Sequence, residues 1–186
     1  MPFTFTPCEI SGLFEIRPKI FGDHRGYFFE CYSQREFSAN GIDAVFVQDN
    51  QSLSGKGTLR GLHFQKIHPQ GKLVRVIEGE VFDVAVDIRK DSPSFGKWHG
   101  IILSGNEQNQ FFIPPGFAHG FLTLSEKAIF AYKCTDFYYP EDESGIIWND
   151  PVIGITWPFI GMDYILSDKD KRLPSFSEME QFEVEN

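Results

Sequence analysis

The sequence predicts a mainly β jelly-roll barrel with a few short helices. Many short segments are rich in β-branched and aromatic residues, and Gly and Pro residues separate them at turn-like spacing. Aromatic residues make up 16% of the chain, with 20 phenylalanines, which indicates an aromatic-rich core rather than a disordered chain. Because 186 residues suit one such barrel, we expect residues 1–186 to form a single domain.

The strongest strand signal covers residues 72–88. Within it, Phe82, Val84, Val86 and Ile88 alternate with Val81, Asp83, Ala85 and Asp87. Glu78 and Gly79 are expected to form a hairpin turn in this segment. Further strands are expected over residues 27–32, 46–52, 58–65, 98–103, 110–113, 120–123 and 128–135.

Two short helices are expected. Residues 34–40 follow a capping box formed by Ser33 and Glu36, and Gly41 is placed to end the helix. A second short helix is expected to begin at Ser167.

Charge and cysteine content exclude several classes of protein. A formal net charge of -9 argues against binding to nucleic acid or to an anionic membrane surface, so an anionic ligand would need a local basic cluster. No run of about 18 apolar residues and no signal-peptide pattern is present. Cys8, Cys31 and Cys134 are odd in number and far apart, which fits neither a disulfide framework nor a zinc site. We therefore expect a cytoplasmic protein.

The segment 57–65, GTLRGLHFQ, and the nearby Lys72 bring two cations and an imidazole into one short stretch. Strict alternation would place Arg60 and His63 on opposite faces of a strand. A shared pocket therefore requires a break in the alternation, which a bulge at Gly61 would supply. A histidine in a strand is more often a structural residue than a catalyst, and the two cations favour the functional interpretation.

The segment 111–124 contains the spacing P-x-G-x-x-H from Pro114 to His119, which resembles the second motif of the cupin superfamily of β-barrels. Metal-binding cupins carry H-x-H and a Glu in their first motif. Here the corresponding residues are His63, Phe64 and Gln65, and the Glu position falls at Pro69 or Gln70. Because the second His and the Glu are missing, we expect no bound metal.

The segment 128–151 places Ala128, Phe130, Tyr132 and Cys134 on one strand face, so Tyr132 is a candidate to point into the barrel. A buried tyrosine with a hydrogen-bonded hydroxyl is the alternative. Tyr138 and Tyr139 fit either a platform for base stacking or ordinary packing. The charges of residues 166–171, LSDKDK, would by themselves suit a solvated helix face.

Seven segments taken together resemble the dTDP-4-dehydrorhamnose 3,5-epimerase family. They are FGDHRGYFFE, FVQDNQS, TLRGLHFQ, PQGKLVRVIEGEVFDVAVDIR, FFIPPGFAHGF, YKCTDFYYPEDESGIIWNDP and LSDKD, in this order over residues 21–170. The resemblance implies a cupin-type jelly roll (a double-stranded β-helix). It also implies inversion of C3 and C5 of dTDP-4-keto-6-deoxy-D-glucose, without a cofactor, on the route to dTDP-L-rhamnose.

The resemblance also implies a role for each matching residue. His63 would be the base, Asp170 its carboxylate partner and Tyr132 the acid on the opposite face of the sugar, while Lys72 would stabilise an enolate oxygen at C4. Substrate contacts would come from Arg25, Glu30, Gln48, Asn50, Arg60, His119, Tyr138, Glu143 and Lys169, with Tyr138 stacked on thymine and Arg25, Arg60 and Lys169 around the diphosphate.

The resemblance further implies a homodimer that pairs through its sheets and exchanges N-terminal strands. Three alternatives stay open. The chain could epimerise only C3 or only C5, it could be a non-catalytic barrel that binds a sugar nucleotide, or it could be a metal-dependent cupin oxygenase. The presence of His63, Asp170 and Tyr132 argues against the binding module.

Overall fold

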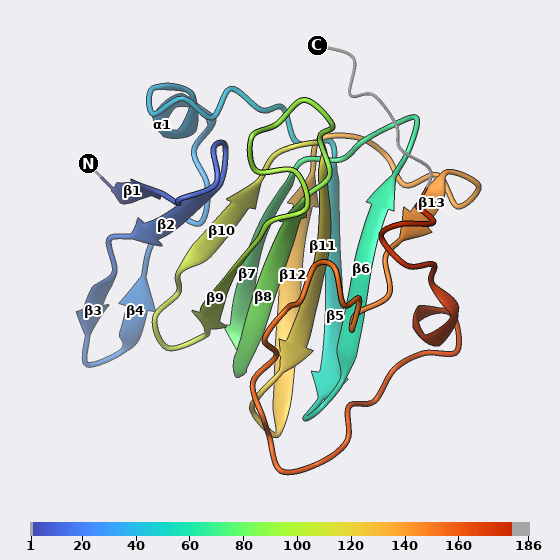
Figure 1. Ribbon diagram of the computed structural model, residues 1–186. Coiled ribbons are helices and arrows are strands. Elements are labelled where there is room, and N and C mark those ends of the chain that lie inside the picture. The colour runs from blue at the N-terminus through green and yellow to red at the C-terminus, as the bar shows by residue number, and fades with distance from the viewer. Residues whose placement is uncertain (1, 180–186) are drawn as a thin grey trace.

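The computed structural model describes residues 2–179 and consists of two facing antiparallel sheets (Figure 1). The six-stranded sheet has the order β1 (Phe3–Pro7), β2 (Phe14–Pro18), β10 (Gln110–Ile113), β7 (Lys72–Glu78), β12 (Lys127–Cys134) and β5 (Gln48–Gly55). The five-stranded sheet has the order β13 (Glu143–Gly145), β6 (Leu59–Gln65), β11 (Phe117–Thr123), β8 (Glu80–Asp87) and β9 (Trp98–Ser104). The mainly β barrel expected from the sequence is confirmed.

The expected hairpin at Glu78 and Gly79 is wrong, because β7 and β8 lie in different sheets. Gly79 adopts a φ of +85°, and a Cβ there would lie 2.1 Å from the Lys127 carbonyl oxygen, so the tight turn requires glycine. The chain uses this turn to pass from one wall of the barrel to the other. Side chains on both faces of β8 are buried, so alternation in the sequence does not reveal that β7 and β8 lie in different sheets.

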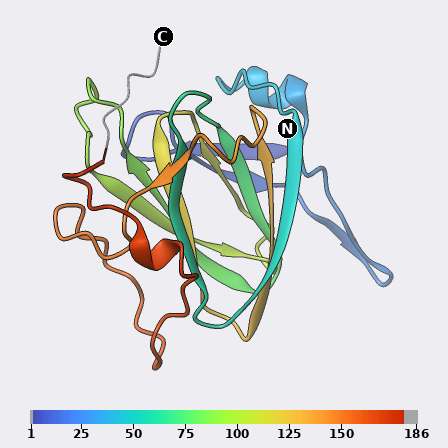
Figure 2. The ribbon, with the colours of Figure 1, turned by 90° about the vertical axis from the view of Figure 1, so that its right-hand side faces the viewer.

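The strand expected over residues 27–32 is much shorter. Only β4 (Gly26–Phe28) is extended, and it pairs with β3 (Phe21–Asp23) in a two-stranded hairpin. Figure 2 shows this hairpin projecting away from the barrel. The chain then turns back, and the Gln110 side chain donates a hydrogen bond to the Cys31 carbonyl oxygen.

Helix α1 (Gln34–Ser38) is where the sequence predicts it, but the capping box is wrong. Ser33 makes no side-chain cap hydrogen bond, and Glu36 instead accepts one from Arg35. Packing holds this short helix, because Phe37 is fully buried and its ring meets those of Phe3, Phe5 and Tyr32 edge to face. The second helix is the 3-10 turn η1 (Asp170–Arg172), which begins three residues beyond Ser167.

The barrel interior has the expected aromatic core. Phe121 of β11 and Phe130 of β12 stack across the two sheets with their ring centroids 4.2 Å apart. A second buried cluster lies outside the five-stranded sheet, where Ile146, Ile153 and Met179 pack on Leu62 and other residues of β6, β8 and β11. The chain beyond β13 thus covers this sheet and carries η1 to the edge of β6 (Figure 2). None of the helices within residues 2–179 has the length and apolar character needed to span a membrane.

Candidate active site

A β-bulge in β6 places Arg60 and His63 in the same cavity. His63 pairs with His119 and Arg60 pairs with Phe121, so β6 has one residue more than β11 over this stretch. Gly61 adopts a φ of +119°, and a Cβ there would lie 2.6 Å from the Gly120 Cα. Glycine is therefore required for the close approach of the two strands, and the break in alternation expected at Gly61 is confirmed.

The His63 imidazole forms a close pair with the Asp170 carboxylate. The Nε2 atom of His63 lies 2.6 Å from Oδ1 of Asp170. Two backbone hydrogen bonds join Ile165 to Gly57 and Leu59, which fixes the segment before η1 along β6 and brings Asp170 to the base. Asp170 is 4% exposed, and burial favours its protonated form. The hydrogen bonds from His63 and Ser167 and the positive field of Lys169 outweigh burial, so the pKa of Asp170 falls below its usual range.

Lys72 and Tyr132 enter the cavity from the opposite sheet. Lys72 begins β7, and burial lowers the pKa of its ammonium group, while the nearby Cys134, Asp83 and Glu143 oppose that shift. Burial also raises the pKa of the Tyr132 phenol. Tyr132 therefore keeps its proton at neutral pH.

The resulting cavity has a volume of about 270 Å³ and lies between the two sheets. The stacked rings of Phe121 and Phe130 form part of its apolar lining. Seven of the residues predicted from the sequence line it together: Arg60, His63, Lys72, His119, Tyr132, Lys169 and Asp170. The arrangement offers a base with a carboxylate partner, a protonated phenol and several cations around one small volume.

Four more predicted residues form a hydrogen-bonded group beside the cavity. The Tyr138 hydroxyl donates to Glu143 Oε2 at 2.5 Å, and Lys169 donates to the same oxygen. The Tyr138 hydroxyl pKa rises to about 12 because the carboxylate holds its proton. Gln48 joins this group by accepting a hydrogen bond from the Tyr138 backbone N–H and by donating one to Asn50.

Two predicted residues, Arg25 and Glu30, do not reach the cavity of their own chain. Arg25 lies at the tip of the projecting hairpin, where its exposed guanidinium pairs with Asp23. Glu30 is exposed after the same hairpin. Within one chain, neither residue contributes to the cavity.

Gln65 stands where metal-binding cupins have their second His, and its side chain bonds to backbone groups. The Gln65 amide donates to the carbonyl oxygens of His68 and Phe137, and its oxygen accepts from the Tyr139 N–H. Across residues 2–179, no cluster of three or more His, Cys, Asp or Glu side chains is arranged to hold a metal ion.

Sequence reasoning missed several residues of the site. Gln51, Ser52 and Ser167 line the cavity, and Ser167 also accepts a hydrogen bond from the Asp170 backbone N–H. Asp83 lies behind His119, whose Nε2 is 3.0 Å from both carboxylate oxygens. The available signal for Asp83 was an acidic residue flanked by apolar residues in a strand, but alternation did not show which face turned inward.

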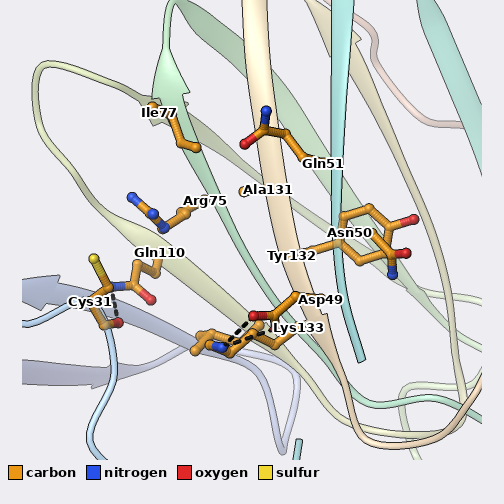
Figure 3. Close-up of a pocket in the computed structure, with 11 residues that line it drawn as sticks. Cys31, Asp49, Asn50, Gln51, Arg75, Ile77, Gln110, Ala131, Tyr132 and Lys133 are labelled. Atoms are coloured by element: carbon orange, nitrogen blue, oxygen red, sulfur yellow. Dashed lines mark hydrogen bonds and ion pairs between the residues drawn. The ribbon is translucent and has the colours of Figure 1, made fainter. Parts of the chain in front are cut away.

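A second cavity, of about 360 Å³, lies on the outer face of the six-stranded sheet. Figure 3 shows Arg75, Gln110, Cys31 and the Lys133–Asp49 ion pair on that face, while Tyr132 and Asn50 extend to the other side of their strands. Leu53 is 64% exposed on β5, where it has the same parity as Asp49 and Gln51. This face of the sheet is open in a single chain.

Comparison with known proteins decides the family. The model of the dTDP-4-dehydrorhamnose 3,5-epimerase family matches residues 7–178. The chain belongs to this family. The family expected from the seven sequence segments is thereby confirmed.

The relatives match nearly the whole chain. The dTDP-4-dehydrorhamnose 3,5-epimerase of Methanothermobacter thermautotrophicus is 54% identical over 170 residues, which cover 91% of this chain and 92% of that protein. The structure of dTDP-6-deoxy-D-glucose-3,5-epimerase from Legionella pneumophila, in complex with dTDP-4-keto-L-rhamnose, is 48% identical with a TM-score of 0.95. That match covers 99% of this chain and 100% of the other. A 3'-monoepimerase of Streptomyces bikiniensis, in complex with dTDP-quinovose, is 33% identical with a TM-score of 0.86 and covers 92% of this chain and 87% of its own.

Proposed function

We propose that this protein inverts C3 and C5 of dTDP-4-keto-6-deoxy-D-glucose to give dTDP-4-keto-L-rhamnose, in dTDP-L-rhamnose biosynthesis. Membership of the 3,5-epimerase family supports the substrate and the reaction. The observation that carries the mechanism is the His63–Asp170 pair, which shares one cavity with Tyr132 and Lys72. These are the groups that proton transfer beside a ketone requires.

His63 would remove the proton next to the C4 carbonyl group. An ionised carboxylate only accepts hydrogen bonds, so the short contact with Asp170 makes the Nε2 atom of His63 the donor. The Nδ1 atom then carries the lone pair that takes the proton. Asp170 orients the ring and stabilises the imidazolium that forms.

Lys72 would stabilise the enolate, and Tyr132 would return a proton. Loss of a proton at C3 or C5 places negative charge on the C4 oxygen, so one cation at that oxygen serves both positions. Such a contact lowers the barrier by about 3 kcal/mol. Tyr132 lines the cavity from the sheet opposite His63 and keeps its proton, which suits a donor to the other face of the sugar.

The cations and aromatic residues beside the cavity would hold the nucleotide. Arg60 and Lys169 are available for the diphosphate, since charges in direct contact outweigh a net charge screened beyond about 8 Å. Tyr138 is half exposed, and its ring is available to stack on thymine. Gln48, Asn50, His119 and Glu143 would complete the contacts to the base and the sugar.

A mono-epimerase is the second candidate, because the match to the Streptomyces bikiniensis 3'-monoepimerase covers 92% of this chain. One experiment separates the candidates and requires no added cofactor. The purified protein and the 4-keto sugar nucleotide are incubated in D2O, and proton NMR follows the C3 and C5 signals. Loss of both signals is expected, loss of one selects the mono-epimerase, and loss of neither from a folded protein refutes the proposed reaction.

We also propose that the active form is a cytoplasmic homodimer paired through the outer face of the six-stranded sheet. That face is open and hollowed, and Arg25 and Glu30 stand away from the cavity of their own chain. A hairpin that projects from one subunit would supply both residues to the cavity of the other. Three free cysteines are compatible with a reducing compartment.

Subunit mixing tests this arrangement. The variants Arg25→Ala and His63→Ala should each be nearly inactive, because each dimer lacks one part of both sites. Mixing them in equal amounts with subunit exchange should restore about a quarter of wild-type activity, since only some heterodimer sites contain both residues. Light scattering that gives a monomer, or mixing without recovery despite confirmed exchange, would refute the proposal.

A further inference from the structure

The Asp83 carboxylate is buried in the apolar interior of the barrel. Its exposed fraction is 0%, and it lies on β8 between Val81 and Ala85, which share its strand face and belong to the inner hydrophobic cluster. It does not line the cavity, whereas its hydrogen-bond partner His119 does. Burial of a carboxylate is costly and needs compensation, so its position calls for an explanation beyond packing.

The contact between Asp83 and His119 defines the state of the imidazole. The Nε2 atom of His119 lies 3.0 Å from each of the two carboxylate oxygens. A protonated acid would direct its single O–H from one oxygen, so equal distances fit an N–H that donates to an ionised carboxylate. Burial lowers the pKa of His119, which keeps the ring neutral at neutral pH. A neutral ring with Nε2–H has its lone pair on Nδ1.

Asp83 also acts on Lys72. Burial raises the pKa of Asp83, and the hydrogen bond from His119 and the positive field of Lys72 oppose that rise. In return, the negative fields of Asp83 and Glu143 favour the charged form of Lys72. One carboxylate behind the cavity thus influences two groups that line it.

We infer that Asp83 is a positioning residue for the proposed epimerisation, holding His119 as the Nε2–H tautomer. The Nδ1 atom of His119 then accepts a hydrogen bond from a sugar hydroxyl group, and the ketone oxygen is left to Lys72. Without Asp83, His119 is free to present an N–H that competes with Lys72 for that oxygen. This inference rests on the proposed function.

The kinetic test compares Asp83→Asn with Asp87→Asn. Both carboxylates are fully buried on β8, but Asp87 bonds to Arg89, Ser92 and Ser94 and does not line the cavity. Asp83→Asn should lower kcat by about 10- to 100-fold, as expected for a misplaced substrate or catalytic group. Its KM, its dTDP affinity and the kcat of Asp87→Asn should stay within about threefold of wild type. Wild-type turnover in Asp83→Asn, or an equal loss of kcat in both variants, would overturn the inference.

A measurement on the wild-type protein does not depend on the folding of a variant or on activity. Nitrogen-15 NMR of the histidine rings should show His119 as the neutral Nε2–H tautomer, and in Asp83→Asn the Nδ1–H form should gain population. A wild-type His119 that is protonated only on Nδ1 would refute the inference. If the wild-type protein exchanged neither C3 nor C5 protons, the proposed function would be refuted. The NMR result on the His119 tautomer would not be affected.

Discussion

Arg60 and His63 lie three residues apart on one strand, yet both side chains line the same cavity. The bulge at Gly61 produces this geometry, because it inserts one extra residue into β6 opposite β11. The chemistry of the cavity therefore depends on a residue that has no side chain.

Gly61→Ala should destabilise the protein by about 1–3 kcal/mol, because φ is positive and the new Cβ would collide with the Gly120 backbone. It should also lower kcat by at least about 10-fold, since any relaxation moves His63. Urea unfolding and the NMR assay measure these effects. Gly55→Ala, which has room for a Cβ, is the control, and equal behaviour of the two variants would contradict the prediction.

His63→Ala should lower the rate of proton exchange at both C3 and C5 by about 100- to 10,000-fold, because it removes the base. The fold, measured by circular dichroism, and the affinity for dTDP should change little. His99→Ala removes an imidazole on β9 outside the cavity and should remain active. Near-normal exchange in His63→Ala would show that another group is the base.

Tyr132→Phe should separate proton removal from inversion. The phenol is the proposed acid, so this variant should still exchange substrate protons with D2O but form the inverted product much more slowly. Proton NMR measures exchange and product formation in the same sample. Tyr164→Phe removes a hydroxyl that bonds to the Pro158 carbonyl oxygen and serves as the control. Inversion at the wild-type rate would remove Tyr132 from the mechanism.

Lys72→Met should lower kcat by about 100- to 1,000-fold, because the cation that faces the enolate oxygen is lost while the side-chain volume is kept. Stability should be retained or increased, since a buried ammonium group is replaced by an apolar one. Steady-state kinetics and thermal unfolding test both statements. Lys127→Met removes an exposed lysine that pairs with Glu78, and it should alter neither quantity greatly.

Asp87 should make the stability of the protein depend on pH. Burial favours the protonated form of Asp87, but hydrogen bonds from Arg89, Ser92 and Ser94 prevail and lower its pKa. A lowered carboxylate pKa contributes stability above the unfolded-state value of about 3.9 and loses it as the pH falls through the folded-state value. Asp87→Asn should therefore cost about 2 kcal/mol at neutral pH and progressively less below about pH 4. Urea unfolding at several pH values measures the difference, and a constant difference would contradict the prediction.

The sequence predicts those parts of the fold whose signal is local. Alternation and turn residues locate β10 at its observed bounds and β5, β6, β9, β11 and β12 within a few residues. β1, β2, β3 and β13 were not predicted, since Pro7 and Pro18 obscure two short strands and β3 and β13 have only three residues each. The capping box failed because tertiary packing of Phe37 determines the position of the helix.

For the site, too, the sequence predicts local features and not contacts between distant segments. Motifs named seven of the residues that line the cavity, and the bulge at Gly61 followed from alternation once a shared pocket was assumed. Local sequence patterns do not predict contacts between distant segments. The hydrogen bond between His119 and Asp83, for example, joins residues 36 positions apart. The position of Arg25 depends on a hairpin whose direction no local pattern specifies.

The His63–Asp170 pair joins residues 107 positions apart, and the segment that carries Asp170 is laid along β6 near the end of the described chain. During synthesis the base is made long before its carboxylate partner, and a nascent chain that stops short of η1 has a barrel without a complete dyad. Closing so long a loop is also among the slower steps of chain collapse. Catalytic activity therefore requires that the chain has been made through η1 and that the segment carrying Asp170 has docked along β6.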